Sequence, residues 1–375
     1  MDKVTIDGES LTIEDVVHVA RHDVQVEVSQ EAMRRVAKCR ETLDKLIKEN
    51  KVIYGVTTGF GFLAGVAITP EESKELQINL IRSHSSAIGK PLGRDAVRAL
   101  MLLRANTMAK GYSGVRLETL ETLVKMLNKK VHPLIPEKGS VGASGDLSAL
   151  SHMALVMLGE GQAEFNGHTM GGLEAMKKAG IDILELEAKE GLALNNGTQL
   201  MTALGALTIH DAEQLIRTAE IISAMSMEAL GAILDAFDNR IHRARAHEGQ
   251  TVTARNILVL TAGSDMVMTS SRMMKEASEK IGVGRLPHDP YTIRCIPQVF
   301  GMARDTIKHA KKIIEVEINS ATDNPLIFPE DNECLSGGNF HGQPIAAAMD
   351  FLSIALSAIG NMSERRISRL LDPTT

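Results

Sequence analysis

Apolar residues recur at helical spacing along most of the chain. In residues 30–49 the stripe comprises Met33, Val36, Leu43 and Leu46 or Ile47, with charged residues between them, which predicts an amphipathic surface helix. Residues 221–234 are apolar on nearly every side, so this stretch is expected to be buried among other helices. Further helices of similar or greater apolar content are predicted over 92–109, 116–128, 146–158, 200–237, 302–320 and 344–371.

Glycine-rich segments separate the predicted helices, whereas alternating β-branched runs are few and short. The glycines gather at 55–65, 139–145, 159–172, 191–197 and 337–342. We therefore predict a mainly α-helical protein, a large bundle of long helices whose active site is formed by the glycine-rich loops. Within one continuous unit, we expect an N-terminal active-site region over 1–200 and a central helical bundle region over 201–375.

The composition of the chain limits the binding partners and the cellular compartment that we expect for it. The 375 residues carry a net charge of −6 with mixed signs, which offers no basic face to nucleic acid and no polybasic segment to a membrane. A small molecule or another copy of the chain is the expected partner. The first fifteen residues hold five acids and resemble neither a secretion signal nor a transit peptide. The three cysteines, Cys39, Cys295 and Cys334, form no CxxC pair, which favours a reducing cytoplasm.

Most familiar catalytic motifs are absent from the sequence. It contains no GxxxxGK[ST] phosphate loop, no HExxH and no clustered histidine and cysteine ligands, so we expect neither nucleotide nor metal chemistry. The GFGFLAG stretch at 59–65 misses the GxGxxG spacing. Ser144 stands in Gly142-Ala-Ser-Gly145 rather than in GxSxG, so a hydrolase triad does not explain it.

The stretch EKGSVGASGDLSALSHMALVM, residues 137–157, allows two interpretations. In the first it is a tight loop leading into a helix, with Asp146 as the N-cap and glycines supplying positive φ angles. In the second, a compressed turn brings the amide nitrogen of Gly145 against the carbonyl carbon of Ala143. Cyclisation with loss of water, followed by dehydration of Ser144, would then give a 4-methylidene-imidazol-5-one ring, an electrophile made from protein alone. The positive end of the following helix would stabilise negative charge on this ring.

The sequence resembles the aromatic amino acid ammonia-lyases and aminomutases, which share this self-made cofactor. The resemblance extends over nearly the whole chain and favours the second interpretation. It implies a helical architecture like that of the fumarases and aspartases. The motifs that carry it, besides the Ala-Ser-Gly triplet, are Tyr54-Gly-Val-Thr-Thr-Gly-Phe-Gly61, Asn195-Asn-Gly-Thr-Gln199, Asp289-Pro-Tyr-Thr-Ile-Arg294, Thr322-Asp-Asn-Pro325 and Gly337-Gly-Asn-Phe-His341.

The resemblance implies roles for individual residues. Tyr54 matches the base that removes a β-proton, and near neutral pH it would need a cationic or helix-dipole neighbour; otherwise it is a packed aromatic residue. Arg294 matches the partner of the substrate carboxylate, or it forms an ordinary ion pair. Tyr291 and Asn196 match residues that bind substrate and support the cofactor, and the alternative for Asn196 is a turn cap.

The pair Ser83-His84 resembles the branch of the family that acts on histidine, as does SGGNFHGQP at 336–344. A neutral His84 imidazole has one donor and one acceptor for a substrate imidazole, although a lone helical histidine also serves structural roles. The implied reaction is elimination of ammonia from L-histidine to give trans-urocanate. The substrate amine adds to the methylidene carbon, Tyr54 takes the β-proton, and ammonia leaves last; addition through the substrate imidazole remains the alternative first step.

Two departures from the family pattern affect these expectations. His288 stands where the family usually has glutamine, so the contact near the substrate carboxylate is expected to differ. The chain ends at Thr375, where family members continue with a helical segment that contributes an acidic residue to the site in the histidine branch, which indicates a fragment or a naturally short member.

The resemblance further implies a homotetramer whose sites draw on several subunits. The alternatives are a lyase or aminomutase of the same family that acts on tyrosine or phenylalanine, and a catalytically silent helical scaffold.

Overall fold

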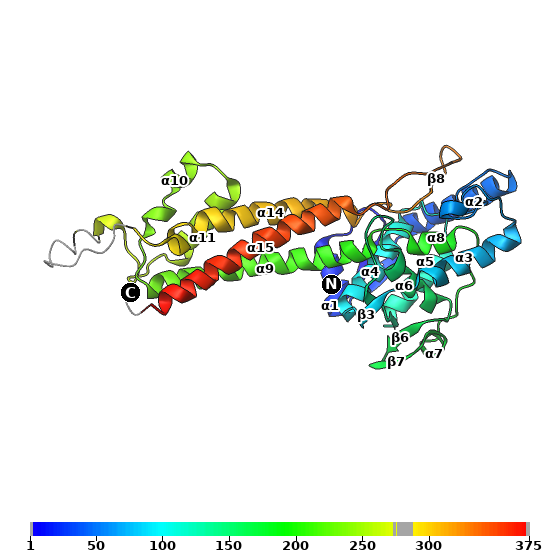
Figure 1. Cartoon of the computed structure of the whole chain (residues 1–375), viewed down its shortest axis with the longest axis horizontal. Coiled ribbons are helices and arrows are strands. Elements are labelled where there is room, and N and C mark those ends of the chain that lie inside the picture. Colours follow the sequence, from blue (N-terminus) through cyan, green and yellow to red (C-terminus); the bar gives the residue numbers. More distant parts are fainter. Residues whose placement is uncertain (1–2, 273–274, 276–287, 373–375) are drawn as a thin grey trace. The chain divides into compact units, whose positions relative to one another are not determined.

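The computed structural model describes residues 3–272, 275 and 288–372, and these are mainly helical (Figure 1). The described residues form two compact units. Unit 1 comprises the described parts of 1–207 and 313–346, and unit 2 those of 208–312 and 347–375. The helices α9 (Gln199–Ala229), α14 (Ile296–Glu317) and α15 (Gln343–Leu370) contribute residues to both units. The expected division into 1–200 and 201–375 stays a prediction.

Unit 1 is built around α4, which is buried along almost its whole length. Every residue from Ala96 to Ala109 is buried, including Arg98 and Arg104. Side-chain caps begin several of the surrounding helices, since Thr12, Ser29 and Thr69 each accept a backbone hydrogen bond in the first turn that follows. The helical elements are α1 (Ile13–His22), α2 (Gln30–Lys48), η1 (Gly61–Leu63), α3 (Pro70–His84), α4 (Arg94–Ala109), α5 (Leu117–Asn128), α6 (Leu147–Met157), α7 (Gly172–Lys178) and α8 (Glu190–Asn195).

The strands of unit 1 are short, as the sequence predicts. The first pair is parallel, with Val4 opposite Val26, and the other sheets are antiparallel. They pair as β1 (Lys3–Ile6) with β2 (Gln25–Val28), β3 (Ile88–Pro91) with β5 (Pro136–Lys138), β6 (Gln162–Phe165) with both β4 (His132–Pro133) and β7 (His168–Gly171), and β8 (Leu326–Phe328) with β9 (Glu333–Leu335).

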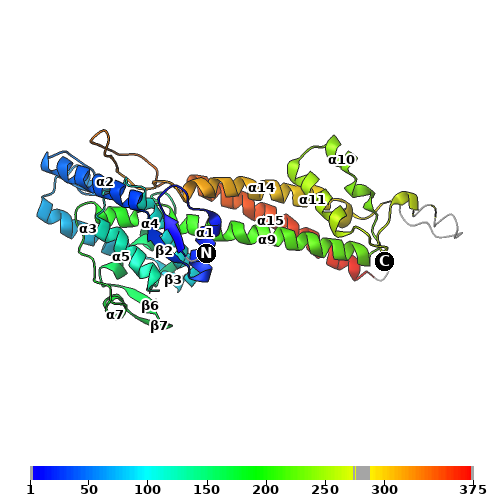
Figure 2. The ribbon, with the colours of Figure 1, turned by 180° about the vertical axis from the view of Figure 1, so that it is seen from behind.

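In unit 2, parts of α9, α14 and α15 lie side by side (Figures 1 and 2). Buried and half-buried polar contacts connect them: Arg304 of α14 pairs with Glu220 of α9 at 2.6 Å, and Arg366 of α15 donates to Ser223 of α9 at 2.5 Å. The remaining elements are η2 (Leu234–Phe237), α10 (Asn239–Ala244), α11 (Glu248–Leu260) and α13 (Tyr291–Arg294).

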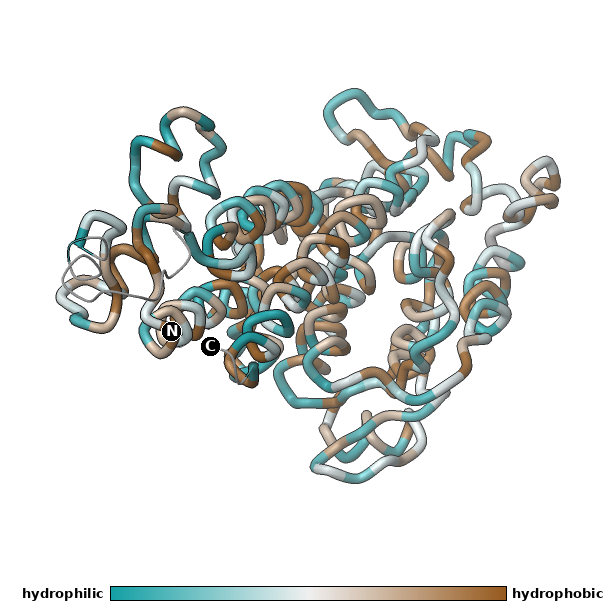
Figure 3. Tube along the Cα trace, turned by 60° about the vertical axis from the view of Figure 1, so that its left-hand side comes forward, coloured by the Kyte–Doolittle hydropathy of each residue, from teal (hydrophilic) through white to brown (hydrophobic). Residues whose placement is uncertain are grey.

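The long helix predicted over 200–237 is corrected in two respects. It ends at Ala229, because Gly231 adopts a left-handed conformation with φ of 57° and the Ala232 amide donates back to the Met227 carbonyl. Residues 221–234 are not buried all round within this chain: the side chains of Ile221 and Ile222 are about half exposed. Apolar residues recur along the helices (Figure 3), and in unit 2 some of them have no covering element in the described chain.

Candidate active site

The loop before α6 is a tight turn that depends on glycine. Gly142 and Gly145 have φ angles of +70° and +76°, and both Gly142 and Ala143 form backbone bridges to Gly145. A Cβ atom at position 145 would lie 2.2 Å from the carbonyl oxygen of Gly197. The positive φ angles that the first interpretation requires are therefore present, and the close approach at position 145 is in keeping with the compressed turn of the second.

Asp146 supports this turn in a way that the sequence did not reveal. It occupies the N-cap position of α6, as the first interpretation predicted, but its side chain makes no capping bond to the first turn of that helix. Instead its carboxylate accepts hydrogen bonds from the Ser140 hydroxyl at 2.6 Å and from the Met201 amide at 3.0 Å, in the first turn of α9. Backbone amides at a helix N-terminus attract negative charge, and here they belong to α9. Burial raises the pKa of Asp146, against the opposing effect of these hydrogen bonds.

The segment between α8 and α9 lies against the same turn. Asn196 donates from Nδ2 to the carbonyl oxygen of Ser144 at 3.1 Å. Behind it, the fully buried guanidinium of Arg104 donates to the Asn196 carbonyl at 3.0 Å, to Gln199 Oε1 at 2.9 Å and to the Ala193 carbonyl. Burial lowers the pKa of Arg104 to about 10. The sequence analysis gave this residue no role, although an arginine among the apolar residues of 92–109 could have indicated a buried polar contact.

A cavity of about 340 Å³ in unit 1 brings together four of the predicted site residues: Tyr54, His84, Ser144 and Asn196. It lies where α3, α6 and α8 pack against one another, and each of these helices ends or begins beside it. The other residues that line the cavity, to which the sequence analysis gave no individual role, are Phe60, Gly61, Leu80, Leu147, Leu192, Asn324 and Phe340. Four of them, Phe60, Gly61, Asn324 and Phe340, lie in the motifs that carry the family resemblance.

Tyr54 is oriented by its own loop. Its hydroxyl oxygen accepts a hydrogen bond from the Gly61 amide at 3.1 Å, and its ring meets the Phe60 ring edge-on with 6.1 Å between centroids. Among the described residues that line the cavity there is no lysine or arginine. We expected Tyr54 to need either a cationic neighbour or the dipole of a helix. The described lining supplies no lysine or arginine as the cationic neighbour.

Tyr291, Arg294 and His288 belong to unit 2 and do not line the cavity of unit 1. The Arg294 guanidinium lies over the Tyr291 ring, 4.5 Å from its centroid, and the Tyr291 side chain is 70% exposed. The Nε atom of Arg294 is buried and has no hydrogen-bond partner in the described part of the chain. His288 Nδ1 lies 3.3 Å from the Asp289 carbonyl oxygen.

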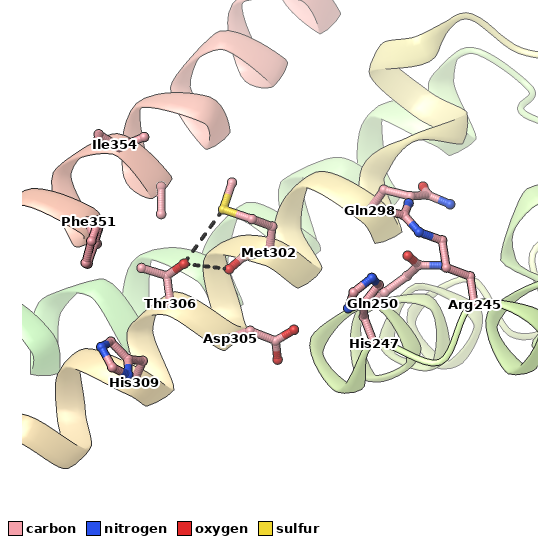
Figure 4. Close-up of a pocket in the computed structure, with 11 residues that line it drawn as sticks. Arg245, His247, Gln250, Gln298, Met302, Asp305, Thr306, His309, Phe351 and Ile354 are labelled. Carbon is pink, nitrogen blue, oxygen red and sulfur yellow. Dashed lines mark hydrogen bonds between the residues drawn. The ribbon is translucent and has the colours of Figure 1, made fainter. Parts of the chain in front are cut away.

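Unit 2 contains a larger cavity, of about 640 Å³, between α14, α15 and the turn from α10 to α11 (Figure 4). None of the predicted site residues lines it. Its polar wall includes Arg245, His247 and Gln298, and the apolar wall includes Met302, Phe351 and Ile354. Volume by itself therefore does not identify the reactive site, because the predicted site residues that share a cavity line the smaller one, in unit 1.

Comparison with known proteins identifies the family. A sequence model of the aromatic amino acid lyases matches residues 11–375. The chain belongs to the aromatic amino acid lyase family. A histidine ammonia-lyase from Caldanaerobacter subterraneus subsp. tengcongensis is 54% identical over 372 residues, which cover 99% of this chain and 71% of that protein. A histidine ammonia-lyase from Streptococcus pyogenes serotype M3 is 50% identical over 371 residues, covering 98% of this chain and 69% of that protein.

Solved structures of lyase-family relatives confirm the mainly helical fold class. A tyrosine aminomutase from Streptomyces globisporus superposes with a TM-score of 0.93 at 42% identity, covering 99% of this chain and 71% of that one. A histidine ammonia-lyase from Trypanosoma cruzi superposes with a TM-score of 0.88 at 40% identity, covering 99% of this chain and 68% of that one.

Proposed function

We propose that this lyase is a histidine ammonia-lyase, which eliminates ammonia from L-histidine to give trans-urocanate. The observation that carries the proposal is the cavity of unit 1, in which the His84 imidazole lies among the same lining residues as Tyr54, Ser144 and Asn196. The names of the relatives that are 54% and 50% identical support histidine over other aromatic amino acids.

The proposed cofactor is a methylidene-imidazolone formed from Ala143, Ser144 and Gly145. The triplet fits this chemistry, because the turn bridges Ala143 to Gly145 and leaves no room for a side chain at position 145. Asn196 would hold the cofactor through its bond to the Ser144 carbonyl. When formed, the ring supplies an electrophilic carbon for the substrate amine, and the chain contains no residue type with that reactivity.

The side chains around the triplet have separate roles in proton transfer and substrate binding. Tyr54, held by the Gly61 amide, accepts the β-proton of the substrate through its hydroxyl oxygen. His84 binds the substrate imidazole and so orients the C–H bond before it breaks. Leu80, Leu147 and Leu192 line the same cavity with apolar surface. The roles that the family resemblance gives to Tyr291, Arg294 and His288 stay predictions.

The test combines mass with turnover. The intact mass and the peptide over residues 139–157 should show a deficit of two water molecules, and L-histidine should give the ultraviolet absorbance of urocanate. Ser144→Ala should lose both signals while remaining folded by circular dichroism. A mature triplet with faster turnover of tyrosine or phenylalanine would favour the alternative substrates. An unmodified triplet without turnover would refute the lyase proposal and leave a helical scaffold.

We further propose that the chain assembles as a homotetramer through unit 2, in the cytoplasm. Within unit 2, apolar side chains are exposed on neighbouring long helices: Ile222 of α9 is 51% exposed, and Phe351 and Ile354 of α15 are 54% and 67% exposed.

Among the described helices, α15 is long and apolar enough to span a membrane, and 28% of its apolar window is buried. Burial of this face against further copies accounts for its composition, and the free state of Cys39, Cys295 and Cys334 is in keeping with a reducing compartment.

Sedimentation velocity tests the assembly. The chain should sediment as a tetramer, and Ile354→Glu should shift it to smaller species. The matched control is Val52→Glu, because Val52 is 85% exposed but lies in unit 1. A monomer at micromolar concentration, or equal effects of the two substitutions, would contradict the proposed interface.

A further inference from the structure

The imidazole of His84 is tied to its own helix through one ring nitrogen. His84 Nδ1 lies 2.9 Å from the carbonyl oxygen of Leu80, one turn earlier in α3. It also lies 3.0 Å from the hydroxyl oxygen of Ser83, whose hydroxyl donates to the same Leu80 carbonyl at 3.0 Å.

These contacts decide which ring nitrogen of a neutral His84 carries the proton. A carbonyl oxygen only accepts, so a bare Nδ1 at 2.9 Å would place two lone pairs against each other. The Ser83 hydroxyl proton is directed at Leu80, which leaves the Ser83 oxygen free to accept from Nδ1 as well. The proton therefore sits on Nδ1, and Nε2 is left with a lone pair and no proton.

We infer that His84 is held in the Nδ1–H tautomer, so that its Nε2 acts as a hydrogen-bond acceptor that selects a substrate ring with an N–H donor. The inference rests on the proposed function, because it specifies how the same cavity recognises its substrate. His84 lines that cavity, and no described residue of the chain bonds to its Nε2 atom.

The consequence is a defined substrate class. An azole with a ring N–H can donate to Nε2, whereas a phenyl ring or a thiazole that fills the cavity would cover this half-buried acceptor and leave it unpaired. A site built around a hydrogen bond discriminates strongly against an analogue that lacks it. Ser83 is a positioning residue in this scheme, because it acts on the imidazole of His84 and not on the substrate.

Nuclear magnetic resonance can read the tautomer without any turnover. The full chain is labelled with imidazole-¹⁵N histidine, and the His84 signals are assigned by their loss in His84→Gln. At pH 8, Nδ1 should have the shift of a protonated ring nitrogen and Nε2 that of an unprotonated one. The reverse pattern would overturn the inference, whether or not the chain turns over histidine.

Binding of two matched probes tests the selection itself. 3-(Imidazol-4-yl)propanoate has a ring N–H and 3-(thiazol-4-yl)propanoate has none, and the two are similar in size and charge. We expect the imidazole probe to bind at least about tenfold more tightly and to shift the His84 Nε2 resonance. In His84→Gln the preference should fall below about threefold, because a glutamine amide can turn either its donor or its acceptor to the ligand. Equal binding of both probes by the unaltered chain would overturn the selection.

Ser83 and Ser85 form a matched pair of variants. Both hydroxyls donate to a helix carbonyl, Ser83 to Leu80 and Ser85 to Ile81 at 2.8 Å, but only Ser83 contacts the His84 ring. Ser83→Ala should weaken binding of the imidazole probe by about 3-fold to 10-fold, the effect of one hydrogen bond. Ser85→Ala should leave it unchanged. Equal effects of the two substitutions would show that Ser83 only supports the end of the helix, and would remove it from the scheme.

The inference and the proposed function can fail separately. If urocanate does not form but the tautomer and the probe preference are as expected, the result counts against the proposed function alone.

Discussion

The carboxylate of Asp146 accepts a hydrogen bond from the backbone amide of Met201 at 3.0 Å. This contact joins the loop that carries Ser144 to the first turn of α9, more than fifty residues later in the sequence. The Asp146 amide also donates to the Gly197 carbonyl at 2.6 Å. The geometry of the Ala-Ser-Gly turn therefore depends on the start of α9 as much as on α6, the helix that directly follows it.

Gly145→Ala should abolish formation of the cofactor. The new Cβ would lie 2.2 Å from the Gly197 carbonyl oxygen, and the φ angle of +76° is unfavourable for alanine. Mass spectrometry of the 139–157 peptide should show no loss of water. Gly167→Ala is the matched control, because its φ angle is +79° but nothing lies within 4 Å of the added atom. A mature triplet in Gly145→Ala would show that the turn tolerates a side chain.

Tyr54→Phe should lower kcat at least about a hundredfold, because it removes the proposed proton acceptor. The global stability should change by only about 1 kcal/mol, since one hydrogen bond from the Gly61 amide is lost. Initial rates of urocanate formation and a denaturant titration measure the two effects. Tyr112→Phe serves as the control, because Tyr112 packs on Phe328 and does not line the cavity. A loss of activity shared by both variants would argue against a specific role for Tyr54.

Arg104→Met should destabilise unit 1. Its buried guanidinium serves the carbonyls of Ala193 and Asn196 and the side chain of Gln199, and each acceptor left unpaired costs about 1–3 kcal/mol. Chemical denaturation should show the loss. Arg34→Met should change stability by less than about 0.5 kcal/mol, because the Arg34 side chain is 77% exposed and its ion-pair partner Glu31 is exposed too. Equal stabilities of the two variants would show that Arg104 is dispensable for holding this segment.

Glu317→Gln should alter the pH dependence of stability. The Glu317 carboxylate accepts from the Thr198 hydroxyl at 2.6 Å, and burial, together with the charge of Asp146, raises its pKa. The unfolded chain then loses this proton at a lower pH than the folded chain, so stability from Glu317 is complete below about pH 4.5 and falls as pH rises through the higher folded value. Glutamine does not ionise and can still accept from Thr198. The melting temperature of the variant, relative to that of the unaltered chain, should rise between pH 4 and pH 8; a constant difference would contradict the raised pKa.

The sequence alone determined the helical fold class and the positions of several helices. The stripe that begins at Met33 lies within α2, and the apolar stretch predicted over 92–109 contains α4 at 94–109. Helical spacing is a local property of the chain, so it can be read from neighbouring residues. Motifs in a shared order likewise pointed to the lyase family, which the match over residues 11–375 confirms.

Only the tertiary structure decided which residues act together. Asp146 has the sequence position of an N-cap for α6, but its carboxylate binds the amides of α9, because these are brought to it by the fold. In the sequence, Arg104 is a charged residue within an apolar helix and has no evident partner. The fold brings residues 193–199 to it, and these supply its three hydrogen-bond acceptors. The apolar stretch at 221–234 predicted burial, but its neighbours in the described chain cover only part of it. The spacing of apolar residues shows which face of a helix needs to be covered. The element that covers this face depends on contacts that are distant in sequence or that come from another copy of the chain.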